Sequence, residues 1–279
     1  MKRIITVSVV SAAIFIVLWI FKIFEITKNM LILGLIGAGL FLIGAVILKV
    51  ITPRIRTGRF FALKQMSLLE WQLTLCFCII LICGSFLLNY LTSLLYGLLA
   101  INAPAAFSGA GYPSMLTAIL CIAVLPAVFE EIFFRGAVLT VLRNSKMKDI
   151  AVIGASAVLF TVLHGPGYYF LTDLYAGILL AVLVYLTGSV YAAMTTHFLS
   201  NFISYFLALY GAKLTEAGIG DLTVHVVVVC LIGAVCHLLH LLKKLILRND
   251  EEDRSRINEN SRRWEEKHSK GENNRVKTR

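Results

Sequence analysis

Charged residues are scarce in this chain of 279 residues, of which 15% are Asp, Glu, Lys or Arg and 58% are hydrophobic. A soluble domain has roughly a quarter charged residues and about half apolar ones. The shortage of charge therefore excludes an ordinary soluble domain. The composition predicts a polytopic membrane protein, and the length of its apolar runs predicts that the protein is all-α.

Cysteine is absent from the predicted loops. The six cysteines all fall inside apolar runs, at Cys76, Cys78, Cys83, Cys121, Cys230 and Cys236. This placement argues against a disulfide framework. Cys76 and Cys78 would point to different faces of a helix, and no second pair in a loop completes a metal site. We interpret the cysteines as lipid-facing or core residues.

Acidic residues are fewer than basic ones, so that the net charge is +10. Twelve of the 26 basic residues lie between Lys243 and Arg279, together with eight acidic residues. Most of the others fall in loops that we assign to the cytoplasm. A basic cytoplasmic surface beside anionic lipid is usual for a membrane protein. We therefore expect no nucleic-acid partner.

Eight apolar runs are separated by loops, and a membrane-spanning helix needs about 20 residues. The runs are 4–21, 31–50, 71–99, 114–142, 150–164, 170–186, 190–210 and 222–245. We predict about eight transmembrane helices in four parts. These are three N-terminal spans in 1–113, a core in 114–210, a last span in 211–247 and a charged tail in 248–279.

Basic residues concentrate on one side of these spans. Lys2 and Arg3, the 54–64 loop, the 143–148 loop and the tail all fall on this side. The opposite side has only Lys22, Lys28 and Lys213. The positive-inside rule therefore predicts that both termini are cytoplasmic.

The run 114–142 contains an ionisable cluster, made of Glu130, Glu131 and Arg135. Burying one charge at bilayer depth costs at least ~2.5–3.5 kcal/mol, so that such a cluster indicates a functional site. Glu131 and Arg135 are four residues apart and can pair on one helix face as a supporting ion pair. Glu130 points about 100° away and needs another partner.

Three further polar side chains are predicted to share the depth of Glu130. At ~1.5 Å per residue, Glu130 and His164 both lie roughly 20 Å from the cytoplasmic ends of their spans. His197 and Asn201 lie roughly 12–18 Å deep on a third span and face the same cavity. We expect Glu130 to face His164, His197 and Asn201. The ring of Phe160, four residues before His164, should wall the histidine.

Pro126 lies one turn before Glu130 and cannot donate a backbone hydrogen bond. It should free the carbonyl of Ile122 and kink the helix at the site. Other polar residues in the spans are expected to be structural, because they lack a deep partner or lie near span ends. These are Glu70, Asp173, His225, His237 and His240.

Three motifs occur in order on consecutive predicted helices: E-E-x-x-F-R-G at Glu130–Gly136, F-x-x-x-H at Phe160–His164 and H-x-x-x-N at His197–Asn201. The set resembles the CPBP family, which includes CAAX-type prenyl endopeptidases and bacteriocin-immunity (Abi) membrane proteases. The resemblance covers 114–210, roughly a third of the chain. It implies an eight-helix intramembrane endopeptidase with a water-filled site, in the cytoplasmic membrane of a bacterium.

The resemblance also implies roles for individual residues. Glu130 would act as general base on water, and His164 would help to hold that water. His197 and Asn201 would donate hydrogen bonds to the oxyanion at the scissile carbonyl. The substrate would be a peptide or protein, such as a prenylated C-terminus or a bacteriocin-type precursor.

A metal is the main alternative within this mechanism, because the family is often named metalloprotease. Glu130, His164 and His197 could form a three-ligand zinc site with an open position. The sequence has no H-E-x-x-H pair, and one glutamate would have to be a ligand while another served as base. We favour catalysis without a cofactor, with zinc or another divalent metal as the alternative.

Two other functions could use the same four polar residues, Glu130, His164, His197 and Asn201. The fold could capture a peptide without cutting it, as a binding or bacteriocin-immunity protein. Deep carboxylates and histidines also form proton relays, so that a proton-coupled carrier is the third possibility.

Overall fold

The structure, a computed structural model, describes residues 2–23, 29–99, 114–145, 147–165, 167–216, 225–248, 250–251 and 259. All regular elements in these ranges are helices, which confirms the all-α class. The chain divides into two compact units, Met1–Val235 and Cys236–Arg279. Most of the charged tail lies outside the described residues, and the predicted four-part division stays a prediction.

The helices coincide with the predicted spans. Their bounds are α1 Lys2–Ile23, α2 Met30–Ile51, α3 Thr57–Phe60, α4 Leu68–Leu98, α5 Met115–Ile119, α6 Leu139–Arg143, α7 Asp149–His164, α8 Phe170–Thr187 and α9 Val190–Glu216. Three π-helical segments, η1 Leu120–Val124, η2 Pro126–Glu130 and η3 Ile132–Val138, join α5 to α6. One more helix, His225–Arg248, follows α9.

Within the described ranges, six of these helices have the length and apolar composition needed to cross a membrane. They include the continuous run from α5 to α6 and the helix His225–Arg248. The helix α7 is shorter, and α9 is long but contains more polar residues than the six spans. The chain is a multi-pass integral membrane protein.

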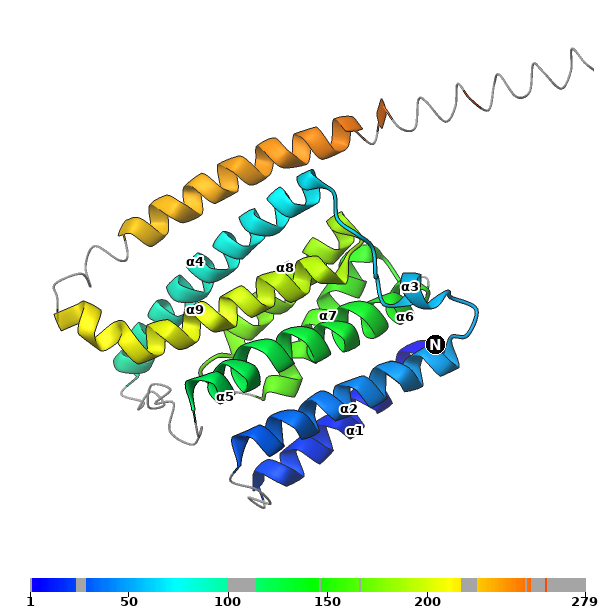
Figure 1. The fold of residues 1–279 in the computed structure, drawn as a ribbon, viewed down its shortest axis with the longest axis horizontal. Coiled ribbons are helices and arrows are strands. Elements are labelled where there is room, and N and C mark those ends of the chain that lie inside the picture. Colours follow the sequence, from blue (N-terminus) through cyan, green and yellow to red (C-terminus); the bar gives the residue numbers. More distant parts are fainter. Residues whose placement is uncertain are drawn as a thin grey trace, which may run out of the picture. The chain divides into compact units, whose positions relative to one another are not determined.

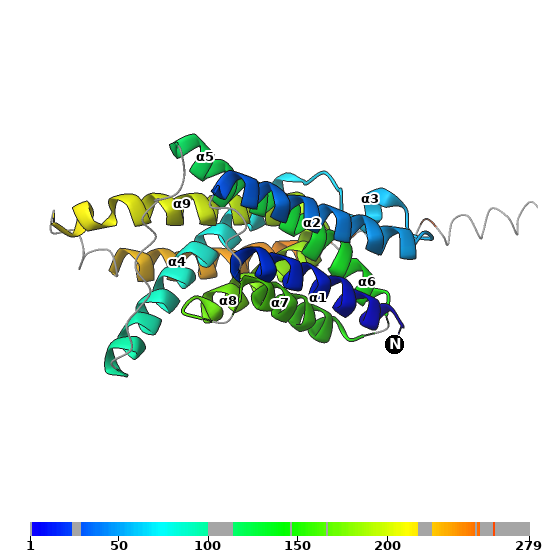
Figure 2. The same ribbon diagram turned by 90° about the horizontal axis from the view of Figure 1, so that it is seen from below.

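The first unit is built around the span that runs from α5 to α6 (Figure 1). The helices α1 and α2 form a hairpin, and α2 packs along η1, η2 and η3. On the other side α9 packs against η1 and η2, while α7 and α8 form a second pair. The helix α4 packs on α8 and α9 (Figure 2). The ionisable cluster is thus enclosed by helices.

Two glycines allow close contacts between these helices. A Cβ on Gly44 of α2 would lie 2.7 Å from the Ile14 side chain and 2.8 Å from the Phe133 ring. A Cβ on Gly177 of α8 would lie 3.0 Å from the backbone of Ala157 on α7. All three distances are shorter than van der Waals contact, so that an alanine at either position would force neighbouring atoms to move.

The segment before α4 is tied to the turn between α8 and α9. The amide of Val190 donates to the carbonyl of Ala62 at 2.9 Å. The hydroxyl of Ser189 donates to the carbonyl of Lys64 at 2.7 Å, and the Lys64 ammonium donates to the carbonyl of Thr187 at 3.1 Å. These bonds join segments more than 120 residues apart at one end of the bundle.

Glu70 has a structural position at the start of α4. It forms a capping box with Ser67, and its carboxylate lies 2.6 Å from the ammonium of Lys64. The carboxylate therefore satisfies orphan backbone donors at the helix start and neutralises a neighbouring lysine.

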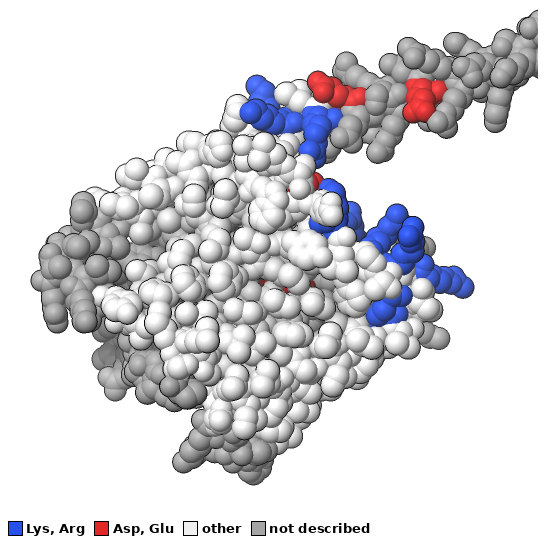
Figure 3. All heavy atoms as spheres, in the orientation of Figure 1, with Lys and Arg blue, Asp and Glu red and all other residues white. Residues whose placement is uncertain are grey.

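Basic side chains gather at one end of the first unit, where α2, α6 and α8 end. Figure 3 shows a visible face of this unit that is almost uncharged apart from Lys and Arg at this end. The guanidinium of Arg3 donates to the carbonyl of Asn144, so that the N-terminus and the 143–148 loop share this end. The cytoplasmic assignment of this basic end stays a prediction.

Candidate active site

The carboxylates lie on a span with π-helical hydrogen bonding. Proline lacks the amide that would bond to the carbonyl four residues earlier, and π-helical turns accommodate such defects. The expected irregularity at Pro126 takes this form, in η1, η2 and η3. The freed carbonyl of Ile122 accepts a hydrogen bond from the Asn201 amide at 3.0 Å. Asn201 of α9 thus fills the backbone position that Pro126 leaves open.

Glu130 lies opposite His164. Its Oε2 atom is 3.6 Å from Nε2 of the histidine, and the two side chains are 12% and 32% exposed. This separation is longer than a normal hydrogen bond. Glu130 Oε2 is buried and has no hydrogen-bond partner among the described residues. The Nδ1 atom of His164 lies 2.9 Å from the carbonyl oxygen of Phe160, which orients the ring.

Glu131 forms a separate and fully buried network. Its Oε1 atom accepts a hydrogen bond from Arg135 at 2.9 Å and lies 2.8 Å from Nδ1 of His197. Arg135 also donates to the carbonyl of Gly177 at 3.2 Å. The side chains of Glu131 and Arg135 are 0% exposed. The predicted pair between Glu131 and Arg135 is confirmed.

The position of His197 differs from the sequence-based expectation. We expected His197 and Asn201 to face Glu130, but His197 contacts Glu131 and Asn201 bonds to the backbone of η1. The rotation of α9 about its axis decides which carboxylate its histidine meets, and helical spacing alone does not define that rotation. Glu131 therefore holds two partners, Arg135 and His197.

Phe160 packs against the histidine beside Glu130 and also against the two partners of Glu131. Its ring centroid lies 4.4 Å from that of His164 and 5.9 Å from that of His197. The guanidinium carbon of Arg135 lies 4.5 Å from the same centroid, a favourable cation–π distance. The predicted wall beside His164 is confirmed, and the same ring also packs on Arg135 and His197.

Asp173 is a carboxylate that we expected to be structural because it lies near a span end. It lies in the first turn of α8 and is close enough to His164 and Glu130 for an electrostatic interaction. The signal was present in the sequence: α8 starts six residues after α7 ends. Because the connection is short, the end of α7 and the start of α8 lie at one depth in the membrane, and so do His164 and Asp173.

The described residues place the three alternative zinc ligands, Glu130, His164 and His197, in two separate pairings. Among them no three His, Cys, Asp or Glu side chains are grouped so that they could hold a metal ion. Glu130 and His164 face each other, whereas Nδ1 of the third proposed ligand, His197, is engaged by Glu131. Nε2 of His197 stays open to a metal, because a histidine ligand commonly donates from its other ring nitrogen to a carboxylate. The zinc alternative therefore stays a prediction.

A small cavity opens beside Glu130. Its volume is about 160 Å³, and apart from this carboxylate its walls are apolar or small. The lining comes from α1, from α2 and from the π-helical span: Leu18, Gly34, Gly37, Ala38, Phe41, Cys121, Leu125 and Pro126. Glu130 is thus reachable from a space with an apolar lining.

One comparison with known proteins gives a match. The family model described as type II CAAX prenyl endopeptidase Rce1-like matches residues 112–203, the stretch that contains all three motifs. No curated protein and no solved structure matches the chain significantly.

Proposed function

Since residues 112–203 match the family model of type II CAAX prenyl endopeptidases, we propose that this chain hydrolyses a peptide bond with a water molecule activated by Glu130. The observation that carries the proposal is the pair formed by Glu130 and His164. Two groups with proton-accepting atoms lie 3.6 Å apart, and Glu130 Oε2 has no other hydrogen-bond partner among the described residues.

The hydrogen bonding of His164 favours water activation. A carbonyl oxygen only accepts, so that Nδ1 carries the proton in the bond to Phe160. In the neutral ring Nε2 is then an acceptor, as is Oε2 of Glu130. A water beside both atoms can donate one hydrogen to each acceptor. Glu130 then takes a proton from this water as general base while the oxygen attacks the carbonyl carbon and the carbonyl oxygen becomes the oxyanion. When the oxyanion collapses, the C–N bond breaks and Glu130 returns the proton to the leaving amine nitrogen.

His197 and Asn201 supply donors for the oxyanion. The Asn201 amide has two hydrogens, of which one bonds to the Ile122 carbonyl and the other remains for a substrate. Nδ1 of His197 donates to Glu131, so that its Nε2 atom donates only when the ring is an imidazolium. Glu131 stabilises that charge, and Arg135 compensates the carboxylate. Glu131, Arg135 and Phe160 are thus positioning residues.

The substrate we propose is a membrane-associated peptide. The cavity beside Glu130 is lined by apolar and small residues, which suits a lipidated or apolar chain. A prenylated C-terminus and a bacteriocin-type precursor both meet this requirement. The proposed location is the cytoplasmic membrane of a bacterium, with both termini and the basic end in the cytoplasm.

The test compares peptides released by cells that express the wild-type protein, Glu130→Gln or a control, His237→Gln. The control replaces a histidine of the last helix that belongs to none of the three motifs. We expect fragments that depend on the wild-type protein, persist with His237→Gln and disappear with Glu130→Gln. Quantitative mass spectrometry of membrane peptides measures them, and Glu130→Gln must be present at wild-type abundance.

Two results would replace the proposal. Identical peptides in all three strains, together with capture of a peptide by the Glu130→Gln protein, would favour a binding protein that does not cleave. A pH-gradient-driven flux in proteoliposomes that Glu130→Gln abolishes would instead favour a proton-coupled carrier.

A further inference from the structure

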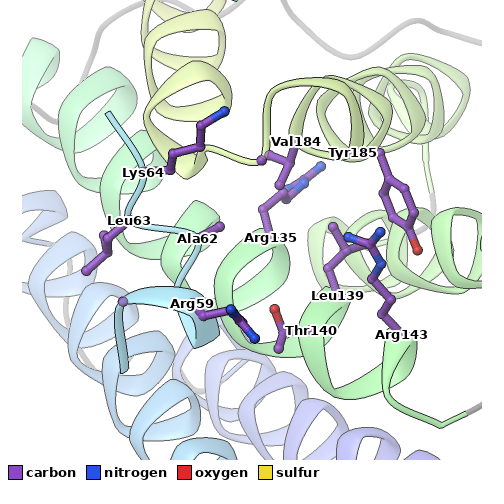
Figure 4. A pocket seen from close by; sticks show the side chains of 12 residues that line it. Arg59, Ala62, Leu63, Lys64, Arg135, Leu139, Thr140, Arg143, Val184 and Tyr185 are labelled. Carbon is purple, nitrogen blue, oxygen red and sulfur yellow. The ribbon is translucent and has the colours of Figure 1, made fainter. Parts of the chain in front are cut away.

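A second and larger pocket lies at the basic end, away from the cavity beside Glu130. Its volume is about 450 Å³. It is lined by the segment 58–64, by η3 and α6, and by the end of α8 (Figure 4). The polar side chains in its wall are Arg59, Lys64, Arg135, Thr140, Arg143 and Tyr185. None of the motif histidines and neither motif glutamate lines it.

The pocket wall has an excess of positive charge. Four of the lining residues are basic and none is acidic. Lys64 pairs with Glu70, and Arg135 pairs with Glu131. Among the described residues Arg59 and Arg143 have no carboxylate partner, although the guanidinium of Arg143 lies 4.7 Å from the Tyr185 ring centroid. These two cations therefore form no ion pair within the described residues, although Asp149 accepts a hydrogen bond from the Tyr185 hydroxyl at 3.2 Å beside Arg143.

The buried lining also offers a donor. Arg135 is 0% exposed, and its Nε atom has no hydrogen-bond partner among the described residues. In Figure 4 the side chain of Arg59 on α3 points toward Thr140 on α6, and the guanidinium of Arg143 lies beside Tyr185. Guanidinium groups bind phosphate through two parallel hydrogen bonds, and a hydroxyl can add a third. The pocket therefore presents donors from several elements to one anionic group.

The location of the pocket identifies the kind of anion. It lies where α6 and α8 end, which is the level at which apolar helices meet lipid headgroups. Leu63, which is 45% exposed, together with Leu139 and Val184, adds an apolar wall. A phospholipid whose phosphate is bound by the arginines would thus have its acyl chains beside apolar side chains. Basic pockets between membrane helices commonly bind anionic headgroups.

We propose that this pocket binds the phosphate-bearing headgroup of an anionic phospholipid. Arg59 and Arg143 contact the phosphate, and Arg135 and Thr140 supply further donors. Since Arg135 reaches both the pocket and Glu131, the lipid lies one side chain away from the proposed catalytic network. The site does not depend on the proposed protease activity.

The test measures lipid binding to the detergent-purified full-length chain. The probes are phosphatidylglycerol, phosphatidylcholine and inorganic phosphate, and the readouts are bound lipid by native mass spectrometry and the lipid-dependent shift in Tm. The variant is Arg59→Gln with Arg143→Gln. The matched control is Arg54→Gln with Arg56→Gln, which removes two exposed charges from the same basic end outside the pocket.

We expect phosphatidylglycerol to bind the wild-type protein and the control equally and to raise their Tm. The pocket variant should bind it roughly 30-fold more weakly, as expected for the loss of two interfacial basic residues. The single variant Arg59→Gln should bind phosphatidylglycerol several-fold more weakly than the wild-type protein. Because Arg59 is exposed, this loss would not be explained by a folding defect. Phosphatidylcholine should not compete.

Three outcomes would overturn the proposal. Equal phosphatidylglycerol binding by the pocket variant and the control would show that the pocket is not the site. Equal stabilisation by phosphatidylcholine would remove the role of headgroup charge. Stabilisation by inorganic phosphate at the same concentration, or displacement by a peptide with a free C-terminal carboxylate but not by its amide, would assign the pocket to another anion.

Discussion

The buried network of Glu131, Arg135 and His197 allows a test that separates stability from activity. Replacing Arg135 with Met keeps much of the side-chain volume but leaves Glu131 at 0% exposure with His197 as its remaining partner. Removing one partner of a buried ion pair costs about 3–5 kcal/mol, because the other charge stays desolvated. The loss of the bond to the Gly177 carbonyl adds to this cost. We expect Arg135→Met to unfold more readily by that amount.

The double variant Glu131→Leu with Arg135→Met should recover most of this stability. Replacing both members of a buried pair by apolar residues is often neutral or stabilising. Its activity should nevertheless stay low, since His197 then loses the carboxylate that orients its ring. Reversible unfolding of the purified protein gives the stabilities, and release of the fragments that depend on Glu130 gives the activity.

The ion pair of Lys64 and Glu70, in which only the lysine is exposed, is the control for this measurement. The lysine side chain is 55% exposed, so that solvent screens the pair and Lys64→Gln should cost at most about 1 kcal/mol. The reasoning is refuted if Arg135→Met is as stable as the wild-type protein. It is equally refuted if the double variant is less stable than Arg135→Met, or if it regains full activity.

Four further predictions concern helix packing, the backbone hydrogen bond missing at Pro126, the catalytic pair of Glu130 and His164, and metal dependence. Gly177→Ala should destabilise the protein by about 1–3 kcal/mol through its contact with the backbone of α7, whereas Gly154→Ala, which meets nothing within 4 Å, should be neutral or stabilising in thermal unfolding. Asn201→Leu should cost about 1 kcal/mol of stability and lower the cleavage rate ~10²-fold or more. Adding Pro126→Ala should restore the stability but not the cleavage, because the new backbone amide can donate to the Ile122 carbonyl. His164→Gln should lower cleavage by ~10²–10⁴-fold with little change in stability, as its side chain is 32% exposed; unchanged cleavage would contradict the water-activation scheme. Treatment with a chelator should leave cleavage unchanged, and a loss that zinc restores would contradict the metal-free mechanism.

Local features of the sequence determined the class of the protein and part of the site. Long apolar runs with few charges predict membrane helices because lipid penalises charge and unpaired backbone groups. The pair of Glu131 and Arg135 follows from helical spacing, since residues four apart share a face. The open backbone position before Pro126 follows from its missing amide. None of these inferences requires knowledge of a second helix.

Only the tertiary structure decided how the helices meet. Spacing along α9 places His197 and Asn201 on one face, but the rotation and packing of α9 bring His197 to Glu131 and Asn201 to the backbone of η1. The basic pocket likewise combines segments more than 100 residues apart, such as those of Arg59 and Tyr185. Contacts between helices depend on packing of all their side chains, and this is why a single helix pattern cannot specify them.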